Sequence, residues 1–325
     1  MPKLVVLDAH TLNPGDISWD PVKSVAEDFT SYERTANEDR LERIGDADLV
    51  LTNKTPLSRD IIEKAPNVRY IGVLATGYNI VDLGAASEKN IVVTNIPGYA
   101  TDAVAQLTFA LLLEVCWHVG HHSRVLKAGR YKTLPDFCFW DFPLSELTGK
   151  VMGIVGYGAI GKAVAKIARA MGMEVIAHNG ERPPKNLGGE TAPTVSFAEL
   201  LRRSDVISLH APLNEKTAGM INRASIAGMK DGVVIINTAR GGLIEEKDLA
   251  DALMSGKVAH AAVDVVSREP IRDDNPLLSV PNCLITPHFA WGPTEVRRRL
   301  METAAENIRR FLAGNPQNTV TFEKS

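Results

Sequence analysis

The sequence predicts an α/β fold with two doubly wound parallel sheets covered by helices, and three observations lead to this prediction. Short apolar runs alternate with helical patterns along the chain, which is typical of parallel strands joined by helices. Several runs are apolar throughout, for example Val233–Ile236, as strands buried on both faces of a sheet require. The length of 325 residues is enough for two such domains.

The N-terminal part of the chain predicts a small sheet with helices between its strands. The expected strands are Leu4–Leu7, Leu49–Leu51, Tyr70–Leu74 and Ile91–Val93, and the expected helices include Asp60–Lys64 and Val81–Lys89. Pro97 and Gly98 then break the pattern and mark a domain boundary. Thr101 or Asp102 can cap a long helix that continues through Glu114.

A second block of alternating elements begins near Val151. Its expected strands are Val151–Val155, Glu174–Ala177, Val206–Leu209, Val233–Asn237, Ala259–Val263 and Cys283–Ile285, with helices at Ile160–Met171, Phe197–Arg203, Ala224–Gly228 and Lys247–Ser255. Thr294 is expected to cap a final amphipathic helix that ends near Phe311. The run Arg297–Arg299 in this helix is expected to be a solvated face rather than a nucleic-acid patch.

The most informative motif is a glycine-rich turn between an apolar strand and a helix. It reads Gly156, Tyr157, Gly158, Ala159, Ile160, Gly161, which is the Gly-x-Gly-x-x-Gly pattern of a dinucleotide-binding βαβ unit. Gly156 permits the turn, Gly158 lets backbone N–H groups approach a pyrophosphate, and Gly161 lets the helix pack close to the strand. The N-terminus of the helix, with Ala159 and Ile160, offers N–H donors and a partial positive charge to phosphates. We therefore expect a dinucleotide cofactor here, against the alternative of a purely structural turn.

The position that discriminates NAD from NADP departs from the usual pattern. The second strand of such a unit should end in an acidic residue that binds the ribose hydroxyls, and Asn179 stands there instead. An amide can bond a ribose hydroxyl without repelling a phosphate, and Arg182 could reach a 2′-phosphate. Glu181 argues for NAD if it points inward. The missing anion favours NADP slightly, but the choice between the two cofactors stays open.

Three polar residues follow the ends of expected strands in the second block. Arg240, Glu269 and His288 each lie just past such an end, where parallel sheets bind their ligands. Taken singly, each could be part of a surface ion pair or a satisfied core contact. Together, beside a nucleotide motif, they indicate a catalytic site.

These side chains suit the reduction of a 2-oxo acid. An arginine can hold the substrate carboxylate and polarise the carbonyl with a fork of donors. Hydride from a reduced nicotinamide leaves an alkoxide, and a histidine, whose ordinary pKa is about 6.5, can supply its proton near neutral pH. A glutamate bonded to the other ring nitrogen orients the ring and favours the imidazolium. We therefore expect Arg240 to bind substrate, His288 to act as acid and base, and Glu269 to support His288.

Composition and charge argue against several other functions. The net charge of −3 gives no basic surface for nucleic acid or an anionic membrane. No apolar run approaches the roughly 20 residues of a membrane helix, and only 3 cysteines, far apart, fit free thiols in the cytoplasm. His118, His121 and His122 have spacings that could bind a metal. No carboxylate or cysteine partner is evident for them, so no metal site is expected.

The chain resembles the D-isomer-specific 2-hydroxyacid dehydrogenases nearly from end to end. The resemblance rests on these motifs, in order: Gly156–Gly161, His210–Leu213, Asn237–Gly242, Ala262–Val265, Arg268–Pro270 and Thr286–His288. It implies two Rossmann-like domains separated by a cleft, a discontinuous substrate-binding domain of residues 1–98 plus 291–325 and a dinucleotide-binding domain of residues 99–290. It also implies a cytoplasmic homodimer, formed through the dinucleotide-binding domain by the helix Asp102–Val119 and the aromatic stretch Phe137–Phe142.

The resemblance further implies which residues line the site. By motif, Arg240 binds the substrate carboxylate, Glu269 supports the histidine, and His288 is the acid and base. Asp264 is implied to meet the nicotinamide carboxamide. The cofactor loops are matched by Ala211, Pro212, Thr217, Thr238 and Ala239, with Arg240 and His288 also among the cofactor contacts. The turn Ala75-Thr76-Gly77 resembles the family's loop whose backbone N–H groups hold the substrate carboxylate, against the alternative of a simple strand-exit turn.

Within the family, the sequence is most similar to the branch that acts on glycerate and hydroxypyruvate. Tyr78–Asp82, Pro97–Tyr99, Val104–Gln106 and His288–Trp291 carry this similarity. Trp291 near the catalytic histidine would narrow the pocket toward hydroxypyruvate or glyoxylate. Two alternatives stay open: a dehydrogenase for another small acid (D-lactate-type, formate or phosphite) and a non-catalytic NAD(H)-sensing binding protein of the same fold.

Overall fold

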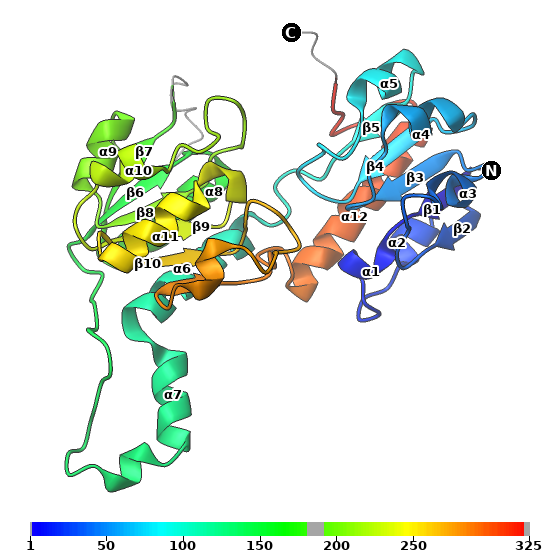
Figure 1. Ribbon diagram of the computed structural model, residues 1–325. Helices are drawn as coiled ribbons and strands as arrows, with labels where there is room; N and C mark the ends of the chain where they lie inside the picture. Colours follow the sequence, from blue (N-terminus) through cyan, green and yellow to red (C-terminus); the bar gives the residue numbers. More distant parts are fainter. Residues whose placement is uncertain (1, 181–191, 322–325) are drawn as a thin grey trace. The chain divides into compact units, whose positions relative to one another are not determined.

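The computed structural model describes residues 2–180 and 192–321, and the chain forms two compact units. Unit 1 consists of Met1–Ala100 and Gly292–Ser325, and unit 2 of Thr101–Trp291. Each unit contains a parallel sheet with helices packed on it (Figure 1). The predicted fold class, two α/β domains with parallel sheets, is therefore confirmed.

Unit 1 is built on a parallel sheet with the strand order β2-β1-β3-β4-β5. The strands are β1 (Lys3–Val6), β2 (Asp28–Ser31), β3 (Leu49–Thr52), β4 (Tyr70–Val73) and β5 (Val92–Thr94). Every residue of β3 and β4 is buried, as expected for strands in the middle of a sheet. The edge strand β2 was not predicted from the sequence, because its residues are mostly polar and partly exposed and so lack an apolar run.

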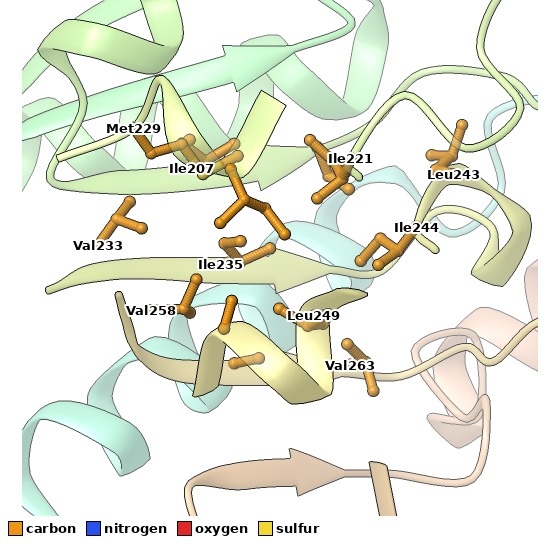
Figure 2. Close-up of a cluster of buried hydrophobic side chains, with 14 of the residues drawn as sticks. Ile207, Ile221, Met229, Val233, Ile235, Leu243, Ile244, Leu249, Val258 and Val263 are labelled. Atoms are coloured by element: carbon orange, nitrogen blue, oxygen red, sulfur yellow. The ribbon is translucent and has the colours of Figure 1, made fainter. Parts of the chain in front are cut away.

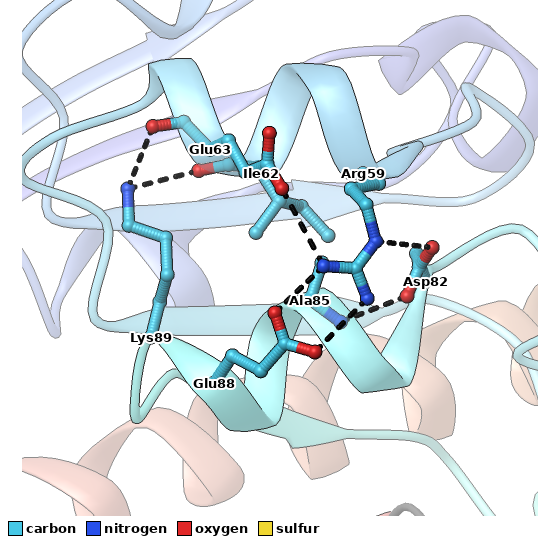
Figure 3. A network of polar contacts seen from close by, with 7 residues as sticks. All are labelled: Arg59, Ile62, Glu63, Asp82, Ala85, Glu88 and Lys89. Atoms are coloured by element: carbon cyan, nitrogen blue, oxygen red, sulfur yellow. Dashed lines mark hydrogen bonds and ion pairs between the residues drawn. The ribbon is translucent and has the colours of Figure 1, made fainter.

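The helices of unit 1 are α1 (Ala9–Leu12), α2 (Asp20–Lys23), α3 (Arg40–Ile44), α4 (Arg59–Lys64), α5 (Leu83–Glu88) and α12 (Thr294–Leu312). α5 begins later than predicted because Asp82 caps it, accepting the N–H of Ala85 at 2.8 Å. Two cations join α4 to α5 at the surface (Figure 3). The guanidinium of Arg59 lies 2.6 Å from the carboxylate of Glu88, and Lys89 donates to carbonyl oxygens at the end of α4.

The last helix, α12, packs against α2 and β4, and two predictions about it were wrong. Thr294 is the first residue of the helix rather than its cap, which is Pro293. The other two arginines of the run are exposed, as predicted, but Arg297 does not lie on a solvated face, because its side chain is only 9% exposed. Its guanidinium pairs with both carboxylate oxygens of Asp16, with Nη1 2.7 Å from Oδ1. Asp16, in the loop after α1, therefore supplies the charge that allows an arginine to be buried here.

Unit 2 contains a parallel sheet with the strand order β11-β10-β9-β8-β6-β7. The strands lie within 1 residue of their predicted ranges: β6 (Val151–Val155), β7 (Glu174–His178), β8 (Val206–Leu209), β9 (Val233–Asn237), β10 (Val258–Val263) and β11 (Cys283–Ile285). Its helices are α6 (Thr101–Trp117), α7 (Val119–Lys127), α8 (Ala159–Ala170), α9 (Phe197–Arg203), α10 (Arg223–Ala227) and α11 (Glu246–Ser255), with 3-10 turns η1 (Arg130–Thr133), η2 (Gly241–Leu243) and η3 (Pro276–Ser279). Apolar side chains from β8, β9, β10 and α11 meet in one buried cluster, which holds this part of the sheet together (Figure 2).

The first long helix of unit 2 is not continuous over its predicted length. α6 ends before His118, which has φ +48°, and α7 continues in a direction bent by 56°. The carboxylate of Glu114 accepts the N–H of Gly120 at 3.2 Å and so caps the second helix. No residue of α7 is buried, and α7 extends away from the sheet of unit 2 (Figure 1). Within residues 2–180 and 192–321, no single helix is long and apolar enough to span a membrane, although the bent pair α6 and α7 passes by length and composition.

Candidate active site

The glycine-rich turn lies between β6 and α8, at the carboxyl end of the sheet of unit 2. Gly156 has φ +95°, and a Cβ there would lie 2.6 Å from backbone atoms of His210 and Ala211. A Cβ at Gly161 would lie 2.2 Å from the carbonyl oxygen of Gly156. At Gly158, by contrast, a Cβ would meet no described atom within 4 Å. Packing against the described residues therefore does not explain Gly158, which lies directly before the first turn of α8.

Asn179, directly after β7, is bonded to the glycine-rich turn. Its side-chain Oδ1 accepts the N–H of Tyr157 at 3.0 Å. Because the N–H of Tyr157 requires an acceptor, the amide oxygen of Asn179 faces the turn. The other polar group of the Asn179 side chain is Nδ2, which is a donor. Arg182 and Glu181, which were also expected to influence the choice between NAD and NADP, lie outside the described residues.

Arg240 follows β9 in a loop that the side chain of Asn237 holds. The buried Asn237 accepts the N–H of Ala239 at 3.0 Å and donates to the carbonyl oxygen of Arg240 at 2.9 Å. Thr238 is buried against α6, where its hydroxyl lies 3.1 Å from that of Thr108. The guanidinium of Arg240 is exposed and donates to the carbonyl oxygen of Ala239 at 2.7 Å. The loop therefore presents a cation at the carboxyl end of the sheet.

His288 and Glu269 form a hydrogen-bonded pair after β11 and β10. Nδ1 of His288 lies 2.6 Å from Oε2 of Glu269, and Oε1 of Glu269 accepts the N–H of Val266 at 3.3 Å. The side chains of His288 and Glu269 are 29% and 37% exposed, so the pair is accessible. Because an ionised carboxylate only accepts hydrogen bonds, Nδ1 carries the hydrogen of this bond, and Nε2 is the nitrogen that can face a substrate.

Asp264 fixes the loop that carries the histidine. Its carboxylate is nearly inaccessible and accepts the hydroxyl of Thr286 at 2.7 Å and the N–H groups of Phe289 and Ala290 at 3.1 and 3.0 Å. His288 has φ +52°, a backbone conformation that residues other than glycine adopt only where their surroundings hold them. Asp264 was expected to contact the nicotinamide, and its anchoring of this loop was not predictable from the motif.

Further loop residues expected at the cofactor and substrate are held by short contacts within unit 2. Ala211 is buried, and the hydroxyl of Thr217 donates to the carbonyl oxygen of Pro212 at 2.6 Å, which closes the loop after β8. Nε1 of Trp291 donates to the carbonyl oxygen of His288 at 2.9 Å. The indole therefore stays beside the loop of the histidine.

His210 forms part of the wall behind the glycine-rich turn. Its Nε2 lies 2.8 Å from the hydroxyl of Ser208, and its enclosed Nδ1 makes no hydrogen bond with any described residue. Burial lowers the pKa of His210 to about 3. The ring is therefore neutral at physiological pH and adds no positive charge beside Gly156.

The turn expected to bind the substrate carboxylate, Ala75–Gly77, belongs to unit 1 and follows β4. The hydroxyl of Thr76 donates to the carbonyl oxygen of Ile96 at 2.9 Å. The N–H of Ile96 in turn donates to the carbonyl oxygen of Ala75 at 3.0 Å. Asn95 adds a bond to the carbonyl oxygen of Thr76 at 2.8 Å. Unit 1 thus fixes this turn by itself, whereas the arginine, glutamate and histidine all belong to unit 2.

The histidines after α6 lie near one another in unit 2. Nε2 of His121 lies 2.7 Å from Oδ2 of Asp141, a carboxylate partner that was not identified from the sequence. Burial lowers the pKa of His118 and of His260, whose rings lie 5.3 Å apart. In the part of the chain that the structure describes, no group of three or more His, Cys, Asp and Glu residues could hold a metal ion.

Comparison with known proteins identifies the family. Residues 109–290 match the model of the D-isomer specific 2-hydroxyacid dehydrogenase, NAD binding domain. The chain is 54% identical to hydroxypyruvate reductase of Blautia hydrogenotrophica over 98% of its length and 99% of the relative's. It is 36% identical to glycerate dehydrogenase of Methylorubrum extorquens over 98% of each chain. The solved structure of acyclic imino acid reductase Bsp5, in complex with NADPH and D-Arg, matches with a TM-score of 0.85 at 30% identity and covers 98% of this chain and 99% of that one.

These matches extend over both units and include the glycine-rich turn and the loops of the three polar residues. They confirm the resemblance that the motifs carried, including the similarity to the hydroxypyruvate and glycerate branch. They also confirm an oxidoreductase with a site for a nicotinamide cofactor. The chain belongs to the D-isomer-specific 2-hydroxyacid dehydrogenases.

Proposed function

We propose that the protein reduces a small 2-oxo acid, hydroxypyruvate or glyoxylate, to the D-2-hydroxy acid with a reduced nicotinamide cofactor. The observation that carries this proposal is the distance of 2.6 Å between Nδ1 of His288 and Oε2 of Glu269. The contact fixes the imidazole tautomer and places a negative charge beside the ring, as a group that donates a proton to an alkoxide requires. The relatives named hydroxypyruvate reductase and glycerate dehydrogenase support the substrate class.

In the proposed mechanism, each polar residue has one task. Arg240 binds the carboxylate of the 2-oxo acid with its forked donors and polarises the carbonyl. We also assign the backbone N–H groups of Ala75–Gly77, in unit 1, to binding of the substrate. When bound, the reduced nicotinamide supplies a hydride to the carbonyl carbon. His288 donates the proton of Nε2 to the carbonyl oxygen, and Glu269 accepts the hydrogen on Nδ1 and so orients the ring.

The fit of unit 2 to a dinucleotide supports the assignment of cofactor contacts. The first turn of α8, with Ala159 and Ile160, offers backbone N–H groups to the pyrophosphate, and Gly158 lets the phosphates approach them. We assign the other cofactor contacts to Gly156, Gly161, Asn179, Arg182, Ala211, Pro212, Thr217, Thr238, Ala239 and Asp264, with Arg240 and His288 at the nicotinamide end.

We further propose that the protein uses NADPH at least as well as NADH. Asn179 directs its oxygen to the N–H of Tyr157 at 3.0 Å, so its second polar group is a donor. A donor can bond a ribose hydroxyl or a 2′-phosphate, whereas an aspartate here would repel the phosphate. The absence of an acidic residue at this position is the basis of the proposal.

Steady-state kinetics test the proposed reaction. The initial rates of hydroxypyruvate and glyoxylate reduction should be measured with NADH and with NADPH, for the wild type and for His288→Gln. We expect turnover that falls by about 10³-fold in His288→Gln, with cofactor binding by fluorescence retained. Cofactor binding without turnover in the wild type would favour the non-catalytic sensing protein. Turnover only with D-lactate, formate or phosphite would assign another small acid.

We also propose that two copies associate through unit 2. α7 and the stretch after it expose large apolar side chains, with Val119 62%, Phe137 87% and Trp140 64% exposed. Surfaces of this kind are uncommon on monomers and mark protein interfaces. Light scattering should therefore give twice the chain mass of 35.3 kDa, and a mass of one chain would contradict the dimer.

A location in the cytoplasm stays a prediction from the family resemblance.

A further inference from the structure

We propose that Glu246 is a positioning residue for the reaction, because it holds the turn that carries Glu269 and thereby sets the contact of Glu269 with His288. This inference rests on the proposed function. Glu246 is the first residue of α11 and lies outside the motifs that suggested the site. Its role follows from the groups that its two carboxylate oxygens bind.

Both oxygens of Glu246 are used by one segment, residues 267–275. Oε1 accepts the N–H of Ser267 at 2.7 Å, and Oε2 accepts the hydroxyl of Ser267 at 2.6 Å and the Nδ2–H of Asn275 at 3.0 Å. Hydrogen bonds to an ionised carboxylate are about twice as strong as those between neutral groups. Glu246 therefore fixes both ends of the segment within which Glu269 lies.

Val266, the residue directly before Ser267, connects this clamp to the reacting groups. The N–H of Val266 donates to Oε1 of Glu269 at 3.3 Å, and Oε2 of the same carboxylate lies 2.6 Å from Nδ1 of His288. Glu269 is therefore oriented from one side by the residue directly before the segment that Glu246 holds. A shift of Ser267 would move the neighbouring Val266 donor, and with it the carboxylate that orients the imidazole.

The peptide between Val266 and Ser267 also borders the loop of the arginine. A Cβ at Gly241 would lie 1.9 Å from the carbonyl carbon of Val266 and 2.3 Å from the nitrogen of Ser267. The backbone of Gly241, directly after Arg240, therefore rests on the peptide next to the clamp. One carboxylate on α11 thus supports the loops of the arginine and of the glutamate. In enzymes generally, a misplacement of about 1 Å can lower rates by about 10²-fold.

The experiment compares Glu246→Gln and Ser267→Ala with a control variant on the same helix, Asp248→Asn. Asp248 accepts the N–H of Arg223 at 2.8 Å, so its contacts lead away from the segment of Glu269. Glutamine keeps the shape of the side chain but replaces one acceptor oxygen by a donor, so it cannot accept all three hydrogen bonds that Ser267 and Asn275 donate. We expect kcat to fall by about tenfold or more in Glu246→Gln and by less in Ser267→Ala. The Kd of NADPH and the Tm should match those of Asp248→Asn.

Two further readouts separate positioning from a general loss of structure. Glu246→Gln should lower kcat little further in a chain that already carries Glu269→Gln, because its effect passes through the carboxylate of Glu269. The hydrogen-bonded proton on Nδ1 of His288 should give a low-field NMR signal in ¹⁵N-histidine-labelled protein. Glu246→Gln should shift or broaden this signal, whereas Asp248→Asn should not. The inference would be overturned if the reductions of kcat caused by Glu246→Gln and Glu269→Gln were fully additive in the double variant. It would also be overturned if Glu246→Gln changed neither kcat nor the NMR signal. An inactive wild type in which the signal still responds to Glu246→Gln would reject the proposed reaction but keep the clamp.

Discussion

At the scale of single residues, the candidate site depends on side chains that bind backbone groups. Asp264 holds the loop of His288, and Glu246 holds the segment of Glu269. Asp264 belongs to a motif and was found from the sequence, although its anchoring contacts were not. Glu246 was not found, because Ser267 and Asn275 lie 21 and 29 positions away along the chain. The residue types of a site can be predicted from motifs, but contacts between loops depend on the folded sheet.

The choice of cofactor can be tested at Asn179. In Asn179→Asp, the oxygen that accepts the N–H of Tyr157 is kept, and the donor is replaced by a second anionic oxygen. The negative charge should repel a 2′-phosphate, so the ratio of kcat/KM for NADPH to that for NADH should fall by about 10-fold or more. Asn179→Ala is the matched control, since it removes the amide without adding charge. A ratio that changes equally in both variants would show that charge at this position does not govern the choice.

At the scale of elements, buried strands were predicted well and interruptions were not. The strands of unit 2 coincide with continuous apolar runs, because a sheet covered on both faces requires such runs. The polar edge strand β2 has no such run and was missed. The break between α6 and α7 was missed because the residue that leaves the helical conformation is His118, which is neither glycine nor proline. The carboxylate of Glu114 stabilises the start of the second helix, because it accepts the N–H of Gly120.

The βαβ unit of the glycine-rich turn gives a prediction that separates ligand binding from folding. A Cβ at Gly158 meets no described atom within 4 Å, so Gly158→Ala should keep the Tm of the wild type. The added methyl would crowd a phosphate at the N-terminus of α8 and raise the Kd of NADPH by about 10-fold or more. Gly156→Ala is the contrasting variant, because its φ of +95° and a contact of 2.6 Å should lower the Tm. Normal cofactor affinity in Gly158→Ala would place the phosphates elsewhere.

At the scale of the whole molecule, unit 1 is assembled from two distant segments of the chain. The N–H of Val320 donates to the carbonyl oxygen of Val93 at 2.8 Å, and Asn307 on α12 donates to that of Asn95 at 3.0 Å. The amphipathic pattern predicted α12 but not the burial of Arg297, because its partner Asp16 lies 281 positions away. The ion pair therefore links the first and last parts of unit 1.

This ion pair predicts how the stability of unit 1 depends on pH. The Arg297 guanidinium, hydrogen-bonded to Asp16, lowers the pKa of that carboxyl below its ordinary value. A carboxyl whose pKa is lower in the folded than in the unfolded chain stabilises the fold above its unfolded pKa of about 4. That contribution is lost as the pH falls through the lowered pKa of the folded state. Asp16→Asn should therefore lower the Tm at pH 7, and the difference from the wild type should shrink as the solution is acidified.

Thermal unfolding followed by circular dichroism from pH 7 to pH 3 measures this difference. Arg297 also donates to the carbonyl oxygens of Leu12 and Gly292, at 3.1 and 2.8 Å, and both bonds persist in Asp16→Asn. The bonds to Asp16 and the bonds to the carbonyl oxygens predict different effects of pH on the Tm, because a carboxylate titrates and carbonyl oxygens do not. If they alone satisfied the buried guanidinium, Asp16→Asn would match the wild type at every pH. We expect the pH-dependent result, since an arginine that is only 9% exposed needs a neighbouring negative charge to offset its desolvation.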